Sequence, residues 1–235
     1  PIIYLRSDGY GEYKSIFGYL GPIIYHAMFS ILSKISSLVS CREYILNNKT
    51  GDIVAPSQIT TRWLEDCKEA QTHNIKLLYV GRIKKEKGIY SLLEIIKNSK
   101  TNFLLSIVGA EKNSSHLITQ DNVYVHEVEN NEENLIKHYD DHNIFVLPSY
   151  TEGHPMALLE ALARLRPVII FRDIEHVIGK KKGIFIAERN PDSFFKIINH
   201  IKENYINIQQ EMKKNKLPTK DEFLKQLSEL ISKLD

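Results

Sequence analysis

The sequence has few cysteines, almost no net charge and no uninterrupted long apolar run. Its two cysteines, Cys41 and Cys67, lack the spacing of metal ligands and are too few for a disulfide framework, which favours a reduced, cytoplasmic protein. A formal net charge of +2 over 235 residues gives no reason to expect a nucleic-acid partner. No secretory signal is visible. The most apolar helical pattern is interrupted by His26 and Lys34, whereas a membrane span needs about 20 apolar residues.

Strand and helix patterns alternate regularly from Lys76 onward. Short apolar runs predict strands, and apolar residues at three- and four-residue spacing predict helices. This alternation is typical of an α/β protein with a Rossmann-like parallel sheet and helices on both faces. The predicted strands are 77–80, 103–108, 123–125, 144–147, 168–171 and 184–186, and the predicted helices are 89–97, 132–139, 155–163, 192–203 and 221–234.

The first 50 residues are less regular. We expect a strand at 1–6, a polar loop at 7–13 and a helix whose apolar face runs from Ile23 to Leu38. That face fits a helix of the domain core, and it also fits a helix that contacts a membrane surface. We place domain boundaries near residues 50 and 205, which gives domains 1–50, 51–205 and 206–235. Because the chain begins at Pro1 with a strand, we expect the first domain to be incomplete and to leave apolar surface exposed.

The most informative stretch runs from Phe145 to Ala161 and predicts a buried strand, a glycine turn and a helix. Such a turn directs free N–H groups out of the carboxyl edge of a sheet, where α/β proteins bind anionic ligands. Two carboxylates flank this point, Glu152 before the helix and Glu160 within it. Carboxylates repel phosphate but accept hydrogen bonds from neighbouring hydroxyls. The pattern therefore indicates a ligand that carries sugar hydroxyls beside a diphosphate.

A second stretch, residues 79–88, also follows a strand and precedes a helix. It carries Arg82, whose guanidinium can clamp phosphate oxygens, and Lys87, which adds a second positive charge. Taken alone, such a charged loop is more often just a solvated surface. Together with the Glu152 turn at the same kind of strand end, it favours a diphosphate site.

These two stretches resemble the nucleotide-sugar domain of retaining glycosyltransferases of family 4. The Arg82–Lys87 pair and the Glu152–Glu160 pair have the family's spacing and order. The resemblance covers residues 51–205 well and the first 50 loosely. It implies a GT-B fold, in which two Rossmann-like domains flank the active site, so that residues 1–50 are a remnant of the acceptor-side domain and 206–235 a linker and helix.

The resemblance also implies roles for particular residues. Arg82 and Lys87 hold the donor diphosphate, Glu152 contacts the transferred sugar, and Glu160 binds the ribose hydroxyls, so that Arg82, Lys87 and Glu152 are the expected catalytic groups. The backbone N–H groups after Glu152 are expected to meet the sugar hydroxyls and the phosphate; this run consists of Gly153, His154, Pro155, Met156 and Ala157. Gly109 lies where the family lets the nucleotide approach the backbone, Val128 lies near the family's base-contacting segment, and Gly81 belongs to the expected donor site as well.

Three positions depart from the family pattern. Leu165 stands where the family has glycine, and a glycine-rich turn is shortened to 172–174 ahead of Glu175. Where the family often carries a histidine facing the reaction centre, Ser7 is followed by Asp8. Asp8 is either a functional acid or the cap of a loop, and His154 is either a turn residue or a catalyst.

The resemblance implies transfer of a sugar from a nucleoside-diphosphate sugar, with a UDP-sugar favoured, to a saccharide or lipid-linked acceptor in bacterial surface-polysaccharide assembly. No cofactor and no metal are expected, since Arg82 and Lys87 take the place of Mg²⁺. We expect a cytoplasmic enzyme with peripheral contact at the inner face of the cell membrane, and a fragment that binds donor but transfers it poorly. Two interpretations remain open: a GT-B sugar-nucleotide epimerase and a non-catalytic nucleotide-sugar-binding subunit.

Overall fold

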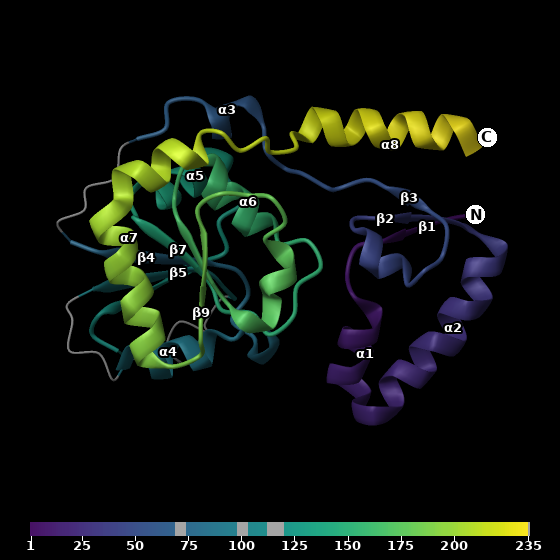
Figure 1. Cartoon of the computed structure of the whole chain (residues 1–235), viewed down its shortest axis with the longest axis horizontal. Coiled ribbons are helices and arrows are strands. Elements are labelled where there is room, and N and C mark those ends of the chain that lie inside the picture. The colour runs from purple at the N-terminus through teal and green to yellow at the C-terminus, as the bar shows by residue number, and fades with distance from the viewer. Residues whose placement is uncertain (69–73, 98–102, 112–119, 235) are drawn as a thin grey trace. The chain divides into compact units, whose positions relative to one another are not determined.

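The computed structural model describes residues 1–68, 74–97, 103–111 and 120–234 (Figure 1). The chain forms two compact units. Unit 1 contains residues 1–60, 151–155 and 218–235, and unit 2 contains residues 61–150 and 156–217. The short segment 151–155, which carries the first motif glutamate, therefore leaves unit 2 and returns to it. Each unit has its own sheet and its own core.

Unit 2 is built on a parallel sheet in which β4 and β7 lie at the centre. Its strands carry continuous apolar runs because both faces are covered, which is why the sequence pattern located them. The six predicted strands of this unit are confirmed. In spatial order they are β6 (Val123–Glu127), β5 (Leu104–Ala110), β4 (Lys76–Val80), β7 (Ile144–Leu147), β8 (Val168–Phe171) and β9 (Ile184–Ala187).

Helices cover both faces of this sheet, as predicted. On one face α4 (Ile89–Lys97) and α7 (Pro191–Met212) lie side by side over the largest apolar cluster (Figure 1). On the other face α5 (Glu132–Asp140) contributes Tyr139, whose ring contacts those of Trp63 and Phe145. The remaining helices of this unit are α3 (Thr61–Leu64), α6 (Met156–Ala163) and the 3₁₀ helices η3 (Lys85–Lys87) and η5 (Arg172–Val177).

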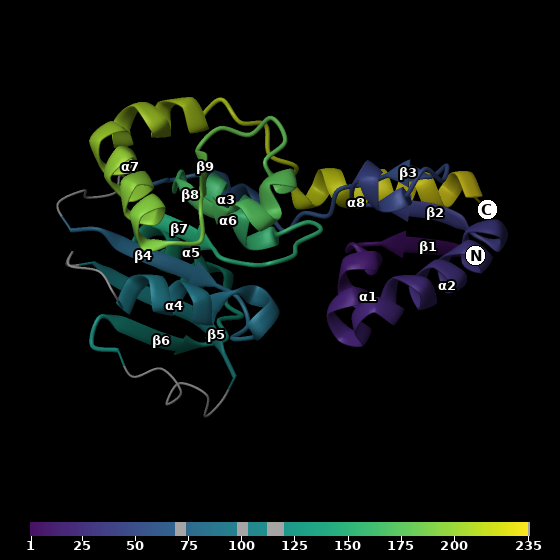
Figure 2. The ribbon, with the colours of Figure 1, turned by 60° about the horizontal axis from the view of Figure 1, so that its bottom comes forward.

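Unit 1 is a small parallel sheet covered by helices on both faces (Figure 2). Neighbouring residues of β2 point in opposite directions. Leu38 packs with α2 (Gly21–Ile35), whereas Val39 packs with the C-terminal helix α8 (Lys220–Leu234). The other elements are β1 (Ile2–Leu5), β2 (Ser37–Ser40), β3 (Asp52–Ile53), α1 (Gly9–Phe17), η1 (Gly18–Leu20) and η2 (Glu43–Leu46).

Much of the apolar surface of α1, η1 and α2 is not covered by the described residues. Tyr19 is 92% exposed, and the neighbouring helix α2 presents further apolar side chains to solvent. The expectation of exposed apolar surface in this region is therefore confirmed. No helix of the described residues combines the length and apolar character required to cross a bilayer. The exposed apolar side chains are Ile16, Phe17, Tyr19, Leu20, Ile23, Ile24, Met28, Ile31 and Ile35.

Several predicted element bounds are wrong in the N-terminal region. The polar stretch 7–13 is not a loop throughout, because Asp8 accepts a hydrogen bond from the Tyr10 amide and thereby caps helix α1. The helix predicted to include Leu38 ends at Ile35, and Leu38 lies in a buried strand instead. The prediction is wrong because apolar residues at 35 and 38 have the three-residue spacing of a helix.

The bounds of two later helices also differ from prediction. Helix α6 begins at Met156, one residue after the predicted Pro155. Helix α7 continues to Met212 instead of ending near residue 203, with a kink at Asn204. Two contacts stabilise this longer helix: the Tyr205 hydroxyl donates to the Asn143 carbonyl at 2.6 Å, and the Met212 side chain is buried.

A buried arginine cluster closes the turn between α6 and β8. The Arg164 guanidinium forms two hydrogen bonds to the Asp140 carboxylate, at 2.8 and 2.9 Å, and Arg166 donates to the carbonyls of Tyr139 and Asp140. Between the two arginines, Leu165 has a φ of +54°. This is the left-handed backbone that glycine adopts most easily, and here a leucine, the residue that departs from the family's glycine, adopts it.

Candidate functional site in unit 2

Arg82 lies in the loop that follows β4, at the carboxyl end of the sheet. The hydroxyl of Tyr79 donates to the Arg82 carbonyl at 2.8 Å and so fixes the loop backbone. The Arg82 side chain is exposed, and Lys87 is half-buried at the end of η3. The loop therefore presents a fixed backbone with a guanidinium directed to solvent, which suits the capture of an anionic ligand.

The loop after β4 contacts the loop after β7, the neighbouring strand. The amide of Tyr150 donates to the Glu86 carbonyl at 3.0 Å. Gly88 has a φ of +67°, and a Cβ at this position would lie 1.8 Å from the Pro148 carbonyl oxygen. Only glycine fits there. The structure thus brings the Lys87 loop and the first residues of the glutamate stretch together within one unit.

Gly109 and Val128 lie beside the first of these loops. The Gly81 amide donates to the Val108 carbonyl at 2.8 Å, and a Cβ on Gly109, where φ is +122°, would lie 2.5 Å from the Gly81 carbonyl oxygen. The amide of Val128 donates to the Ala110 carbonyl, while its side chain is exposed. Gly81, Gly109 and Val128 are therefore neighbours at the carboxyl edge, and Gly109 is required there by the approach of Gly81.

Glu160 lies on α6 and is buried, with only 9% of its surface exposed. The fully buried Tyr139 donates its hydroxyl to Glu160 Oε2 at 2.8 Å, and the same hydroxyl lies 3.2 Å from the Ala157 carbonyl. Burial raises the pKa of Glu160, and the hydrogen bond from Tyr139 opposes that rise. Burial and the nearby carboxylate also raise the pKa of Tyr139 well above its ordinary value. Tyr139 therefore holds one carboxylate oxygen in a set position as an acceptor.

Residues 151–155 belong to unit 1 and are fixed there by its N-terminal part. A Cβ on Gly153 would lie 2.8 Å from the Arg6 carbonyl oxygen, and the Tyr44 hydroxyl lies 3.4 Å from the Glu152 carbonyl oxygen. His154 Nε2 lies 2.8 Å from the Pro56 carbonyl, so this nitrogen carries a proton and donates it. That bond favours the interpretation of His154 as a turn residue.

Two residues of this site were not found from the sequence. Tyr139, which holds Glu160, lies 21 residues before it on a different helix. Arg189 lies 41 residues after Pro148 and donates to its carbonyl at 2.9 Å. No motif marked either residue, because neither contact is local. Among the described residues no group of three His, Cys, Asp or Glu side chains could hold a metal ion.

The comparisons with known proteins agree with this fold. The sequence profile of the family described as "Glycosyl transferases group 1" matches residues 63–217. The capsular polysaccharide biosynthesis glycosyltransferase CapM of Staphylococcus aureus is 33% identical over 147 residues. That alignment covers 57% of this chain and 37% of CapM, so the chain spans well under half of that relative.

Solved structures show the same fold at low sequence identity. Sucrose-phosphate synthase from Thermosynechococcus elongatus matches with a TM-score of 0.77 at 17% identity, over 99% of this chain and 67% of that one. Anabaena HepE, solved in complex with UDP and glucose, matches with a TM-score of 0.72 at 11% identity, over 98% of this chain and 71% of that one. The architecture is that of a GT-B-like α/β fold. With a family profile that matches unit 2 almost from end to end, the chain belongs to the glycosyl transferases group 1 family.

Proposed function

We propose that this chain binds a nucleoside-diphosphate sugar, with a UDP-sugar favoured, and belongs to an enzyme that transfers the sugar with retention. The acceptor would be a saccharide or a lipid-linked acceptor in bacterial surface-polysaccharide synthesis; CapM, a relative, is named for capsular polysaccharide biosynthesis. The observation that carries the proposal is the buried carboxylate of Glu160, held as an acceptor by Tyr139 in the same unit as the cationic Arg82 loop. Ribose hydroxyls beside a diphosphate require that combination.

The chemistry follows from the charges of the loop. As the glycosidic bond breaks, negative charge develops on the leaving diphosphate. Arg82 and Lys87 would stabilise that charge, each through charge-assisted hydrogen bonds worth roughly 1.5–3 kcal/mol. We propose that these cations act without a metal ion. Glu152 would contact the sugar that is transferred.

The diphosphate clamp is tested by titrating the protein calorimetrically with UDP. Arg82→Ala and Lys87→Ala should each weaken UDP binding by roughly 1.5–3 kcal/mol. Lys84→Ala is the matched control, because Lys84 is an exposed lysine of the same loop and has no assigned role. Unchanged affinity in both Arg82→Ala and Lys87→Ala would refute the phosphate assignment.

The two glutamates are distinguished by comparing UDP with UDP-glucose. Glu160→Gln should weaken binding of UDP itself, since ribose belongs to that part of the ligand. Glu152→Gln should leave UDP affinity nearly unchanged and impair only the sugar-bearing donor. Incubation with donor and a lipid or saccharide extract then separates transfer from epimerisation, because an epimerase would yield an isomerised sugar nucleotide and no acceptor product.

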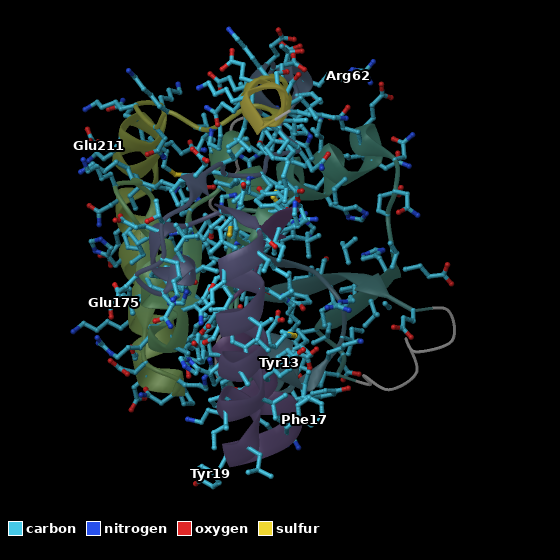
Figure 3. The ribbon with its side chains drawn as sticks, turned by 90° about the vertical axis from the view of Figure 1, so that its right-hand side faces the viewer. Tyr13, Phe17, Tyr19, Arg62, Glu175 and Glu211 are labelled. Atoms are coloured by element: carbon cyan, nitrogen blue, oxygen red, sulfur yellow. The ribbon has the colours of Figure 1, made fainter. Side chains whose placement is uncertain are left out.

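We also propose that the exposed apolar surface of unit 1 contacts the surface of a membrane that contains anionic lipid. Figure 3 shows Phe17 and Tyr19 at one end of the α1–α2 helix pair. Helix α2 contains no acidic residue and carries Lys34 in its last turn. Apolar side chains flanked by an aromatic tip and basic residues are typical of helices that lie in the lipid headgroup region.

Vesicle flotation tests the membrane contact. The protein should float with vesicles containing phosphatidylserine, and the double variant Phe17→Ser, Tyr19→Ser should float less. Ile206→Ser is the control, because Ile206 is 72% exposed but lies on α7 of unit 2. Flotation equal to wild type in the double variant, or concentration-dependent self-association that the double variant abolishes without any flotation, would contradict the proposal.

A further inference from the structure

Arg189 connects three segments of unit 2 through its guanidinium. It follows β9 and donates from Nη1 to the Pro148 carbonyl at 2.9 Å and from Nη2 to the Ser149 carbonyl at 3.4 Å. Nη1 also donates to the Ser91 hydroxyl at 3.3 Å. Ser91 lies in the first turn of α4, directly after the Lys87 loop. One side chain therefore contacts the backbone of the glutamate stretch and the helix that begins after the lysine.

Asp173 fixes the remaining donors of this arginine. Arg189 Nε and Nη2 donate to Asp173 Oδ2 at 3.2 and 2.6 Å. With these contacts all five N–H donors of the guanidinium have an acceptor. Its central carbon Cζ also lies over two aromatic rings, 4.0 Å from the centroid of Tyr150 and 4.4 Å from that of Phe171. The side chain is thereby held in one position, with its charge partly shielded from water.

The Arg189 contacts lie where the loop 85–88 meets the loop 148–150. Pro148, whose carbonyl accepts from Arg189, is the residue that approaches Gly88 closely enough to exclude a Cβ there. A Cβ on Gly88 would also lie 3.2 Å from Arg189 Nη1. Two residues further on, Tyr150 stacks on the guanidinium and donates its amide to the Glu86 carbonyl beside Lys87. A shift of Arg189 would therefore move both loops.

We propose that Arg189, oriented by Asp173, is a positioning residue that holds loops 85–88 and 148–150 together and thereby places Lys87 for the donor diphosphate. The placement of a diphosphate there rests on the proposed function; the coupling of the two loops does not. Asp173 lies in the shortened turn 172–174, so this ion pair occupies the place where the sequence departs from the family's glycine-rich turn. Arg189 and the shortened turn 172–174 are therefore parts of the same local structure.

A lysine cannot replace this arginine. An ammonium has three donors on a flexible stem and no planar group to lie over the two rings, whereas the site uses five donors and a flat group. Arg189→Lys keeps the charge and the aliphatic stem, which makes it the more informative substitution. Arg172→Lys is the matched control, because Arg172 is a neighbouring arginine that pairs with Glu188 and Glu175 at the surface.

The experiment measures amide hydrogen exchange without nucleotide and UDP affinity by calorimetry, both well below the unfolding temperature of every variant. In Arg189→Lys and Asp173→Asn we expect faster exchange in segments 85–88 and 148–150 and about tenfold weaker UDP binding, the effect of losing roughly one charge-assisted hydrogen bond. Arg172→Lys should match wild type in both measurements. A merely structural arginine would lower the unfolding temperature and leave the UDP affinity of the folded protein unchanged.

The outcomes separate this inference from the proposed function. Unchanged exchange in both segments overturns the coupling, whatever the ligand result. Faster exchange with UDP affinity equal to wild type overturns the role in placing Lys87. If wild type itself binds no nucleoside diphosphate, the proposed function fails, and the exchange data alone then decide whether Arg189 couples the loops.

Discussion

The hydrogen bond between Tyr139 and Glu160 gives a prediction whose size should depend on pH. Tyr139→Phe removes one hydroxyl from a fully buried ring and leaves the ring contacts with Trp63 and Phe145 in place. What is lost is the 2.8 Å bond to Glu160 Oε2. When Glu160 is ionised, the loss leaves a buried carboxylate oxygen without this donor, which costs roughly 1.5–3 kcal/mol.

The sign of the pH dependence follows from the shifted carboxyl group. The pKa of Glu160 is raised above its ordinary value of 4.5, so its ionisation lowers stability as the pH rises through the folded-state pKa. Without the Tyr139 donor that pKa rises further. The free energy of unfolding lost in Tyr139→Phe should therefore reach its full value only above the folded-state pKa of the variant. Near pH 4.5 and below, it should fall to about 1 kcal/mol, the net value of a neutral hydrogen bond.

Urea unfolding of wild type and variant at a series of pH values measures this difference. Tyr205→Phe is the matched control, since Tyr205 is also buried and donates to an uncharged acceptor, the Asn143 carbonyl. Its cost should not change over the same pH range. In the background of Glu160→Gln, the pH dependence of Tyr139→Phe should disappear. A cost of Tyr139→Phe that is constant with pH would refute the assignment of Glu160 as the ionised partner.

Three further predictions concern stability. Leu165→Gly should raise the free energy of unfolding by about 0.5–1 kcal/mol, because glycine adopts the positive φ without strain, whereas Leu165→Ala should not raise it. A lower free energy of unfolding in the glycine variant would show that the leucine is not strained at this position. Asp140→Asn should lower the free energy of unfolding by about 3–5 kcal/mol, because it breaks the buried ion pair with Arg164. The control Glu133→Gln, at the exposed pair with Arg62, should lower it by less than about 1 kcal/mol, and equal losses in chemical denaturation would refute the prediction. Burial lowers the pKa of His142 to about 4, so the titration of His142 should remove about 3 kcal/mol of stability as the pH falls from 6.5 toward 4. Wild type should therefore lose about 3 kcal/mol more than His142→Gln over this range, and equal acid profiles of the two proteins in chemical denaturation would count against this assignment.

The sequence by itself determined the sheet of unit 2 and the positions of Arg82 and Glu160 relative to its strands. Strands covered on both faces are apolar along their whole length, so a short apolar run such as 144–147 identifies a strand even when its neighbouring strands are unknown. Arg82 and Glu160 were placed by the same local logic, because each lies a few residues from the end of a strand that the pattern had located. Consecutive parallel strands end at one edge of a sheet, so their loops were expected near one another.

The tertiary structure decided which elements meet and which side chains hold the site. The amphipathic pattern of α8 predicts a helix with one apolar face, but only the fold shows that this face packs on Val39 in the sheet of unit 1. Leu38 followed a helical spacing and yet lies in a strand, because pairing with Ile3 of β1 outweighs a local pattern. Tyr139 and Arg189 carry no motif, since each acts on residues far along the chain. Local periodicity records which face of an element is buried, whereas the partner on that face is set by the topology that brings distant residues together.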